Sequence, residues 1–175
     1  MKTIIYSSPF VPAEWIAAHG IKPVRLTPAS QDCAGPIKTS EGICPYMMSF
    51  INTALSRKPS AIITTTTCDQ MRRAPDVAGI EDIPFFVMNI PATWQTAQSL
   101  NLYISELKRL GRFMCDLGGN PPKQDELISV MNQYEEERSK LRSSRGITKP
   151  RIFSENIMLF NETGAFTTIS STKDS

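Results

Sequence analysis

The stretch that most constrains the fold of this chain is residues 61–73, with the sequence AIITTTTCDQMRR. Residues 61–67 are almost all β-branched, which favours a pleated and largely buried strand. The strand runs into Cys68, and residues 70–73 can begin a helical turn. Cys68 is therefore expected at the carboxyl end of a strand, the edge of an α/β sheet where ligands bind. It is also expected beside a helix N-terminus, where free N–H groups favour a thiolate. The alternative is that Cys68 is a small buried hydrophobic residue, as most free cysteines are.

The rest of the chain alternates strands and helices, which predicts an α/β fold with a parallel sheet and flanking helices. The expected strands are residues 2–6, 21–26, 61–67 and 83–90, and residues 157–160 offer one possible further short strand. The expected helices are residues 12–20, 45–55, 100–117 and 125–142, and the last two predict an antiparallel helical hairpin. Pro23 places its strand near an edge of the sheet, and residues 74–82 are expected to form a loop.

A second cysteine is expected in the same kind of position as Cys68. Cys44 precedes Pro45, which suits the first position of a helix, so Cys44 is expected at the N-cap. Two thiols at helix starts could share one ligand, although the same placement also arises by chance in α/β domains. The four cysteines, at positions 33, 44, 68 and 115, do not have the CxxC spacing of a zinc knuckle or a ferredoxin.

Structural roles are expected for the other titratable residues that stand out. His19, the only histidine, falls in the last turn of a helix, where a cationic imidazole would stabilise the carbonyl end, and this role is favoured over catalysis. Cys115 lies beside an apolar stripe and is expected to pack. The charges on the same helix are expected to be solvated: Glu106, Lys108, Arg109 and Arg112.

Composition limits the class of protein. The 175 residues, 41% hydrophobic and 21% charged, favour one globular domain or one and a fraction. A net charge of +2 is too small to indicate nucleic acid or an anionic membrane as a partner. The sequence contains neither an apolar run of the ~20 residues that span a bilayer nor a signal-peptide core. The protein is therefore expected in the cytoplasm, where cysteines are metal ligands, reactive thiols or buried residues rather than disulfides.

Four stretches of the chain carry a resemblance to a known family. They are VPAEWIAAHGIKPVRL, ICPYMMSFINTAL, TTTTCDQMRR and SLNLYISELKRLGRFMCDLGG. Together they resemble the 2-hydroxyacyl-CoA dehydratase and benzoyl-CoA reductase family, whose iron–sulfur subunits are called the dehydratase D-component. The third stretch is the most specific, whereas the second has Met48 where the family often has Arg. The resemblance spans residues 2 to about 145 in order.

The resemblance implies a Rossmann-like domain over residues 1–145 and radical dehydration (a lyase reaction) or reduction of a CoA thioester. It implies a 4Fe–4S cluster held by three cysteines, the first two of which correspond to Cys44 and Cys68. It also implies three partners: a homologous dehydratase subunit, an ATP-dependent activator protein that injects an electron, and an acyl-CoA substrate.

The departures from the family pattern lead to further expectations. Family members are longer, and their third cluster cysteine lies in a second domain. Residues 146–175 are expected to be a linker and the truncated, poorly ordered start of that domain, so the chain looks like an N-terminal half that is not active alone. Cys33 is the alternative third ligand. Two other functions stay open: a non-catalytic remnant that has lost its cluster, and a small iron–sulfur accessory protein that uses Cys33, Cys44 and Cys68.

Overall fold

The computed structural model describes residues 1–28, 35, 42–78, 82–93, 95–144, 156–160 and 166–170. The chain divides into two compact units, Met1–Pro121 and Pro122–Ser175. The first unit contains β1 (Thr3–Tyr6), α1 (Ala13–Ala18), β2 (Lys22–Arg25), α2 (Pro45–Ser56), β3 (Ala61–Thr65), α3 (Asp69–Arg72), α4 (Ala74–Ala78), β4 (Phe85–Met88) and α5 (Ala97–Asp116). The second contains α6 (Gln124–Ser144), β5 (Asn156–Phe160) and β6 (Phe166–Ser170). None of the described helices is long and apolar enough to cross a membrane.

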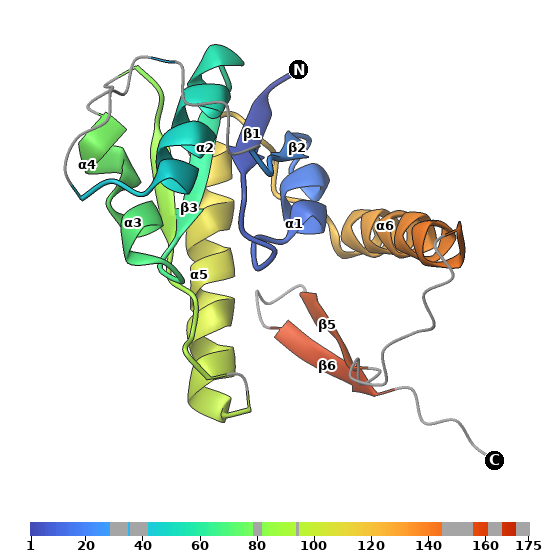
Figure 1. The fold of residues 1–175 in the computed structure, drawn as a ribbon. Coiled ribbons are helices and arrows are strands. Elements are labelled where there is room, and N and C mark those ends of the chain that lie inside the picture. The colour runs from blue at the N-terminus through green and yellow to red at the C-terminus, as the bar shows by residue number, and fades with distance from the viewer. Residues whose placement is uncertain are drawn as a thin grey trace. The chain divides into compact units, whose positions relative to one another are not determined.

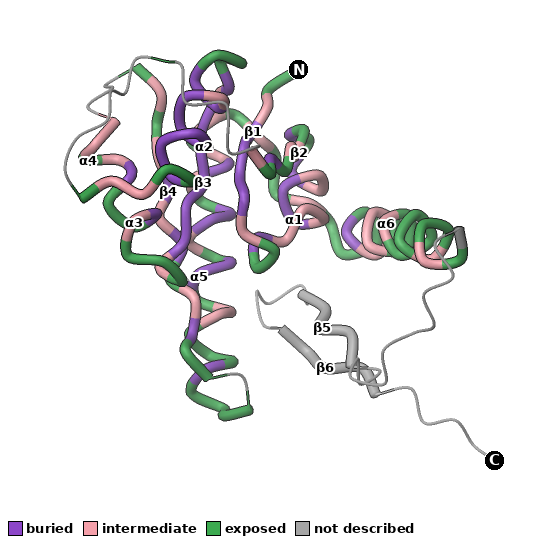
Figure 2. The backbone as a smooth tube through the Cα atoms, viewed as in Figure 1, coloured by how far each residue is buried: buried purple, intermediate pink, exposed green. Residues whose placement is uncertain are grey.

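The first unit is built on a sheet of four parallel strands in the order β2–β1–β3–β4 (Figure 1). The expected α/β fold is therefore confirmed, and β2, which contains Pro23, lies at an edge of the sheet as its proline predicted. β3 pairs with a strand on each side, and all of its residues are buried, which explains its β-branched composition. Figure 2 shows buried residues concentrated along β1 and β3.

One face of the sheet packs against α2, α3 and α4. Ile5 of β1 and Ile62 of β3 lie in one buried cluster with the apolar side of α2. The cluster also takes in Met71 of α3 and Ala74 of α4, so the segment between β3 and β4 closes over this face.

The loop expected over residues 74–82 is wrong for its first part, because Ala74–Ala78 form α4. Pro75 lies in the first turn of this helix, where a proline is tolerated because that N–H has no intrahelical partner. Ala74 is fully buried in the cluster beneath α2. Tertiary packing therefore stabilises a turn of helix that is too short to show a periodic pattern.

The other face of the sheet packs against α1 and α5. Trp15 of α1 donates a hydrogen bond from Nε1 to the carbonyl oxygen of Leu107, 3.0 Å away on α5. A Cβ at Gly111 would lie 3.4 Å from the Trp15 ring and 3.5 Å from Nε2 of His19. The glycine thus allows α1 and α5 to approach closely.

His19 ends α1 and is only 2% exposed. Its Nδ1 donates to the carbonyl oxygen of Trp15 at 2.8 Å, because a carbonyl can only accept. Burial lowers the pKa of His19, and this effect outweighs the hydrogen bond to Trp15, which raises it. His19 is therefore a packed interior residue, and the cationic imidazole expected at the helix end is wrong because desolvation favours the neutral ring.

Glu106 and Arg109 of α5 were expected to be solvated, and the structure contradicts this for Glu106, whereas the Arg109 side chain is 40% exposed and ion-paired with Glu106. Glu106 is 6% exposed and accepts hydrogen bonds from the backbone N–H of Asn89 (2.8 Å), the Asn89 amide (3.2 Å) and Nη2 of Arg109 (2.6 Å). Arg109 also donates to the carbonyl oxygen of Val87 and lies over the Phe86 ring, 4.1 Å from its centroid. The pair ties α5 to the end of β4. The two other residues of this helix that were expected to be solvated, Lys108 and Arg112, are exposed.

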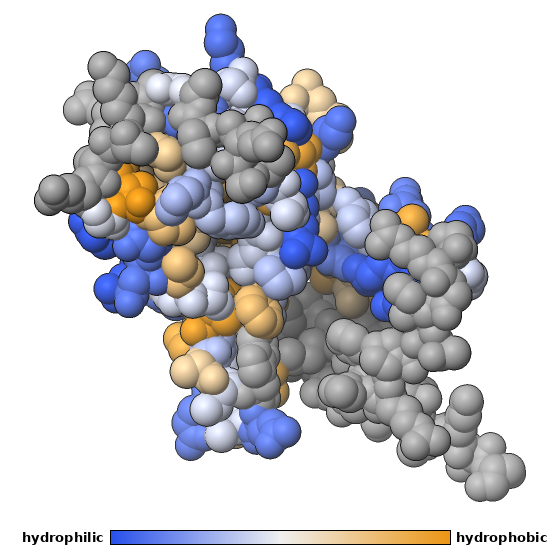
Figure 3. All heavy atoms as spheres, viewed as in Figure 1, coloured by the Kyte–Doolittle hydropathy of each residue, from blue (hydrophilic) through white to orange (hydrophobic). Residues whose placement is uncertain are grey.

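The apolar stripe of α5 is buried only along the C-terminal half of the helix. Leu107, Leu110 and Met114 are buried, whereas Leu100 and Leu102 are 38% and 44% exposed. Figure 3 shows hydrophobic side chains among polar ones over the N-terminal half of this helix.

The second unit combines α6 with an antiparallel pair of strands, β5 and β6. The short strand expected near residues 157–160 is confirmed as β5, but β6 was not predicted, because its Thr- and Ser-rich sequence lacks apolar alternation. Both helices of the expected hairpin form. α5 belongs to the first unit and α6 to the second, so the packing of these two helices as a hairpin remains a prediction. The domain boundary near residue 145 also remains a prediction.

Candidate functional site

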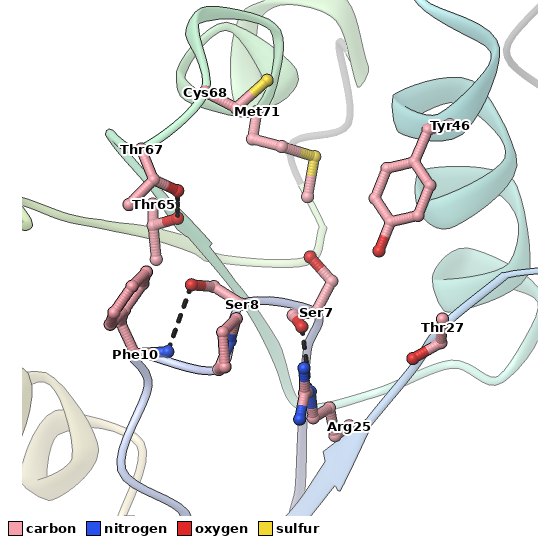
Figure 4. Close-up of a pocket in the computed structure, with 11 residues that line it drawn as sticks. Ser7, Ser8, Phe10, Arg25, Thr27, Tyr46, Thr65, Thr67, Cys68 and Met71 are labelled. Carbon is pink, nitrogen blue, oxygen red and sulfur yellow. Dashed lines mark hydrogen bonds between the residues drawn. The ribbon is translucent and has the colours of Figure 1, made fainter. Parts of the chain in front are cut away.

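The carboxyl ends of β1, β2 and β3 meet at an open pocket with a volume of about 290 Å³ (Figure 4). Parallel strands bring the segments that follow them to one edge of the sheet, which is where ligands bind in open α/β folds. The pocket is lined by Ser7, Ser8, Pro9, Phe10, Arg25, Thr27, Tyr46, Thr65, Thr67, Cys68 and Met71.

Cys68 is the N-cap of α3, shortly after the end of β3, and it is exposed. The position predicted from the sequence is therefore confirmed, and the alternative of a buried cysteine is wrong. α3 has only four residues, so its dipole at Cys68 is small. What makes the Cys68 thiol available to a ligand is mainly its exposure beside the pocket. Cys68 can meet a ligand at this edge of the sheet.

Cys44 is the N-cap of α2, as Pro45 predicted, and is half-buried. Its Sγ accepts a hydrogen bond from the backbone N–H of Met47 at 3.4 Å. α2 has twelve residues, so the helix dipole at Cys44 is larger than the dipole at Cys68 on the four-residue α3.

Gln70 connects the two cysteine-bearing helix starts. Its Oε1 accepts a hydrogen bond from the backbone N–H of Cys44 at 3.2 Å, and Gln70 itself follows Cys68 by two residues in α3. Sequence reasoning missed this residue, because a glutamine at the start of a helix carries no signal for a contact with a segment 26 residues earlier.

The turn after β1 also contributes to the pocket, through Ser7, Ser8, Pro9 and Phe10. The Tyr103 hydroxyl of α5 donates to the carbonyl oxygen of Phe10 at 2.9 Å, and the Ser8 hydroxyl accepts from the N–H of Phe10 at 3.3 Å. Burial raises the pKa of Tyr103 to about 12, and the charge of Glu14 adds to the shift. The tyrosine therefore stays protonated and keeps donating to this turn.

The described residues fit part of an iron–sulfur site. They place two thiols, Cys44 and Cys68, at helix starts on either side of Gln70, but they contain no group of three side chains placed to hold a metal ion. A 4Fe–4S cluster usually takes more protein ligands than two. Cys33, the alternative third ligand, lies outside the described residues, and Cys115 lies half-buried on α5.

Comparison with protein families matches residues 9–169 to the family described as 2-hydroxyglutaryl-CoA dehydratase, D-component. The matched range includes both helix-start cysteines and most residues of the pocket. Comparison with curated proteins finds no significant match. Because the family match extends over most of the 175 residues, the chain belongs to the 2-hydroxyglutaryl-CoA dehydratase D-component family.

Proposed function

We propose that this chain is a subunit, or part of a subunit, of an iron–sulfur enzyme that dehydrates 2-hydroxyacyl-CoA thioesters or reduces an aromatic CoA thioester. The observation that carries the proposal is the hydrogen bond from the backbone of Cys44 to Gln70, which links the two cysteine-bearing helix starts at one edge of the sheet. The family match supports a dehydratase-like subunit in general.

In this proposal Cys44 and Cys68 are two ligands of a 4Fe–4S cluster. When bound, the cluster supplies the single electron that makes radical chemistry on a thioester accessible. The residues of this chain bind and orient. The backbone N–H of Met47 at the start of α2 donates to the Cys44 sulfur, and Gln70 fixes the position of the Cys44 backbone relative to α3. Exposed Cys68 is one of the residues that line the pocket.

The proposal requires ligands besides these two thiols. Cys33 or a second polypeptide would supply them, which agrees with the homologous subunit and the ATP-dependent activator that the family implies. The described residues contain no third ligand, which is also compatible with a second function, that of a non-catalytic family member without a cluster. Reconstitution separates these two functions.

The test is anaerobic reconstitution of the purified chain with iron and sulfide, followed by visible absorbance and EPR after reduction. We expect a cluster signal in the wild type that is lost or strongly reduced in Cys44→Ala and in Cys68→Ala. Cys115→Ala is the matched control, because Cys115 is a half-buried cysteine on α5, and it should reconstitute like the wild type. A signal unaffected by either helix-start substitution would refute the ligand assignment, and no signal in the wild type would favour the non-catalytic alternative.

A further inference from the structure

Among the described residues that line the pocket beside Cys68, Arg25 is the only one with a charged side chain (Figure 4). We infer that this pocket binds the anionic oxygen group, a carboxylate or a phosphate, of a small organic ligand, with Arg25 as its anchor. The inference goes beyond the thiol chemistry of the site. It rests on the proposed function in one respect, that the anion belongs to the small molecule on which this edge of the sheet acts.

The Arg25 side chain is oriented but not neutralised. Its Nε donates to the carbonyl oxygen of Ser7 at 3.1 Å, which fixes the guanidinium at the end of β2. The terminal Nη groups remain available, since Arg25 forms no ion pair with a carboxylate of the described residues. A guanidinium offers parallel N–H donors that match the two oxygens of a carboxylate or phosphate.

Three hydroxyl groups supplement the guanidinium. The side chains of Ser7, Thr27 and Tyr46 line the pocket, and their hydroxyls form no hydrogen bond with the described part of the chain. In Figure 4 the hydroxyls of Tyr46 and Ser7 are directed toward one another. These groups can donate to further oxygens of a bound anion.

The other hydroxyls of the pocket each have a hydrogen-bond partner already, so the hydroxyls without a partner among the described residues lie with Arg25 in the pocket wall. Thr65 and Thr67 bond to each other at 2.8 Å, and Ser8 accepts from the N–H of Phe10. The rest of the wall is largely apolar and includes Phe10 and Met71.

The size of the pocket limits the ligand. About 290 Å³ lies at the low end of the range for small-molecule sites, so it suits one anionic group with a short apolar remainder rather than a whole nucleotide. The apolar remainder would contact Phe10, Met71 and the ring of Tyr46.

The test is a titration of the ¹⁵N-labelled, metal-free full chain with inorganic phosphate and, separately, with butyrate, followed by NMR. Saturable shifts are expected at the Arg25 Nε–H and at pocket amides. Arg25→Gln should weaken binding about tenfold or more, since it removes charge-assisted hydrogen bonds. Tyr46→Phe keeps the ring, removes one donor, and should weaken binding about three- to tenfold. Arg57→Gln is the matched control, because Arg57 is exposed and caps the other end of α2, and it should leave binding unchanged.

A response to one probe alone supports the site and identifies the anion as carboxylate or phosphate, and a response to both supports it for either anion. Equal affinity in the wild type and Arg25→Gln, or no saturable shift with either probe, overturns the inference. If Arg25→Gln does not fold, judged by the dispersion of its spectrum, an undiminished affinity in Tyr46→Phe overturns the hydroxyl-assisted site. The titration uses no iron, so its failure is distinguishable from a failed cluster reconstitution.

Discussion

The Oε1 of Gln70 accepts a hydrogen bond of 3.2 Å from the backbone N–H of Cys44. This bond joins the N-cap of α2 to the first turn of α3, and the N-cap of each of these helices is a cysteine. Both thiols belong to flexible side chains on loop-to-helix junctions. The hydrogen bond from the Cys44 backbone to the Gln70 side chain therefore restricts the separation of the two junctions more effectively than either cap alone.

Replacing Gln70 is expected to loosen this arrangement. Gln70→Ala should cost about 1 kcal/mol of stability, because it removes one hydrogen bond. It should also reduce the fraction of metal-free chain in which one trivalent arsenical is bound by both thiols, Cys44 and Cys68. This fraction is measured by mass spectrometry after a fixed reaction time. Gln70→Glu is the control, because a carboxylate oxygen can still accept from the Cys44 N–H. Absence of bridging in the wild type would show that the two thiols do not converge.

The buried carboxylate of Glu106 should make stability depend on pH in the acid range. Burial raises the pKa of Glu106, but the hydrogen bonds from Arg109 and Asn89 together outweigh burial and hold the pKa below its ordinary value of 4.5. A carboxyl whose folded pKa is depressed contributes stability above its unfolded pKa, and this contribution is lost as the pH falls through the folded pKa. Glu106→Gln should therefore lower the free energy of unfolding by about 1–3 kcal/mol at neutral pH, and the difference should shrink below about pH 4.5.

The measurement for Glu106 is urea unfolding of wild type and variant across this pH range. Glu135→Gln is the control, because Glu135 pairs with Arg138 and Arg142 on α6 but half of its side chain is exposed. An exposed pair of this kind contributes about 0–1 kcal/mol. Equal effects of the two substitutions would contradict a special role for the buried carboxylate.

His19 should produce a second pH dependence, closer to neutrality. Its folded pKa lies below the ordinary value of 6.5, mainly because of burial, so the unfolded chain binds the proton more tightly. Stability is therefore expected to fall as the pH drops below 6.5 toward the folded pKa, and His19→Asn should remove this slope. As the only histidine, His19 can be followed by NMR of its ring protons. A midpoint at or above that of the urea-unfolded chain would contradict a buried, neutral ring.

The central features of the fold could be predicted from the sequence because they depend on local patterns. The β-branched run of β3 marks a buried strand, Pro23 marks an edge, and Pro45 marks the start of α2. The errors concern residues whose environment is set by distant segments. Nothing near Glu106 in the sequence reveals that the end of β4 provides its hydrogen bonds, and α4 is too short to show a period.

The candidate site follows the same division. The position of Cys68 after a strand and of Cys44 before a proline could be predicted, because each depends on its immediate neighbours. Arg25 and Gln70 could not be identified. Arg25 enters the pocket because β2 pairs beside β1, and Gln70 reaches Cys44 because α2 and α3 pack on the same face. Both contacts depend on tertiary structure that a single sequence does not display.

The last prediction concerns catalysis by this chain alone. With activator protein, ATP and reductant under anaerobic conditions, the purified chain is not expected to turn over a hydroxyacyl-CoA ester. The described residues offer two thiols at helix starts, Cys44 and Cys68, so at least two irons of a cubane cluster would need ligands from elsewhere. The pocket beside Cys68 is also open, and water and oxygen would reach a radical intermediate there.

The assay measures product formation over a panel of hydroxyacyl-CoA esters, with Cys68→Ala as the matched variant. Addition of a homologous dehydratase subunit is expected to restore turnover only if that subunit completes the ligand set and covers the pocket. The decisive comparison is between the chain with and without this partner. Sustained product formation by the chain alone that disappears in Cys68→Ala would show that two helix-start thiols and an open pocket suffice, and would contradict the argument from ligand number.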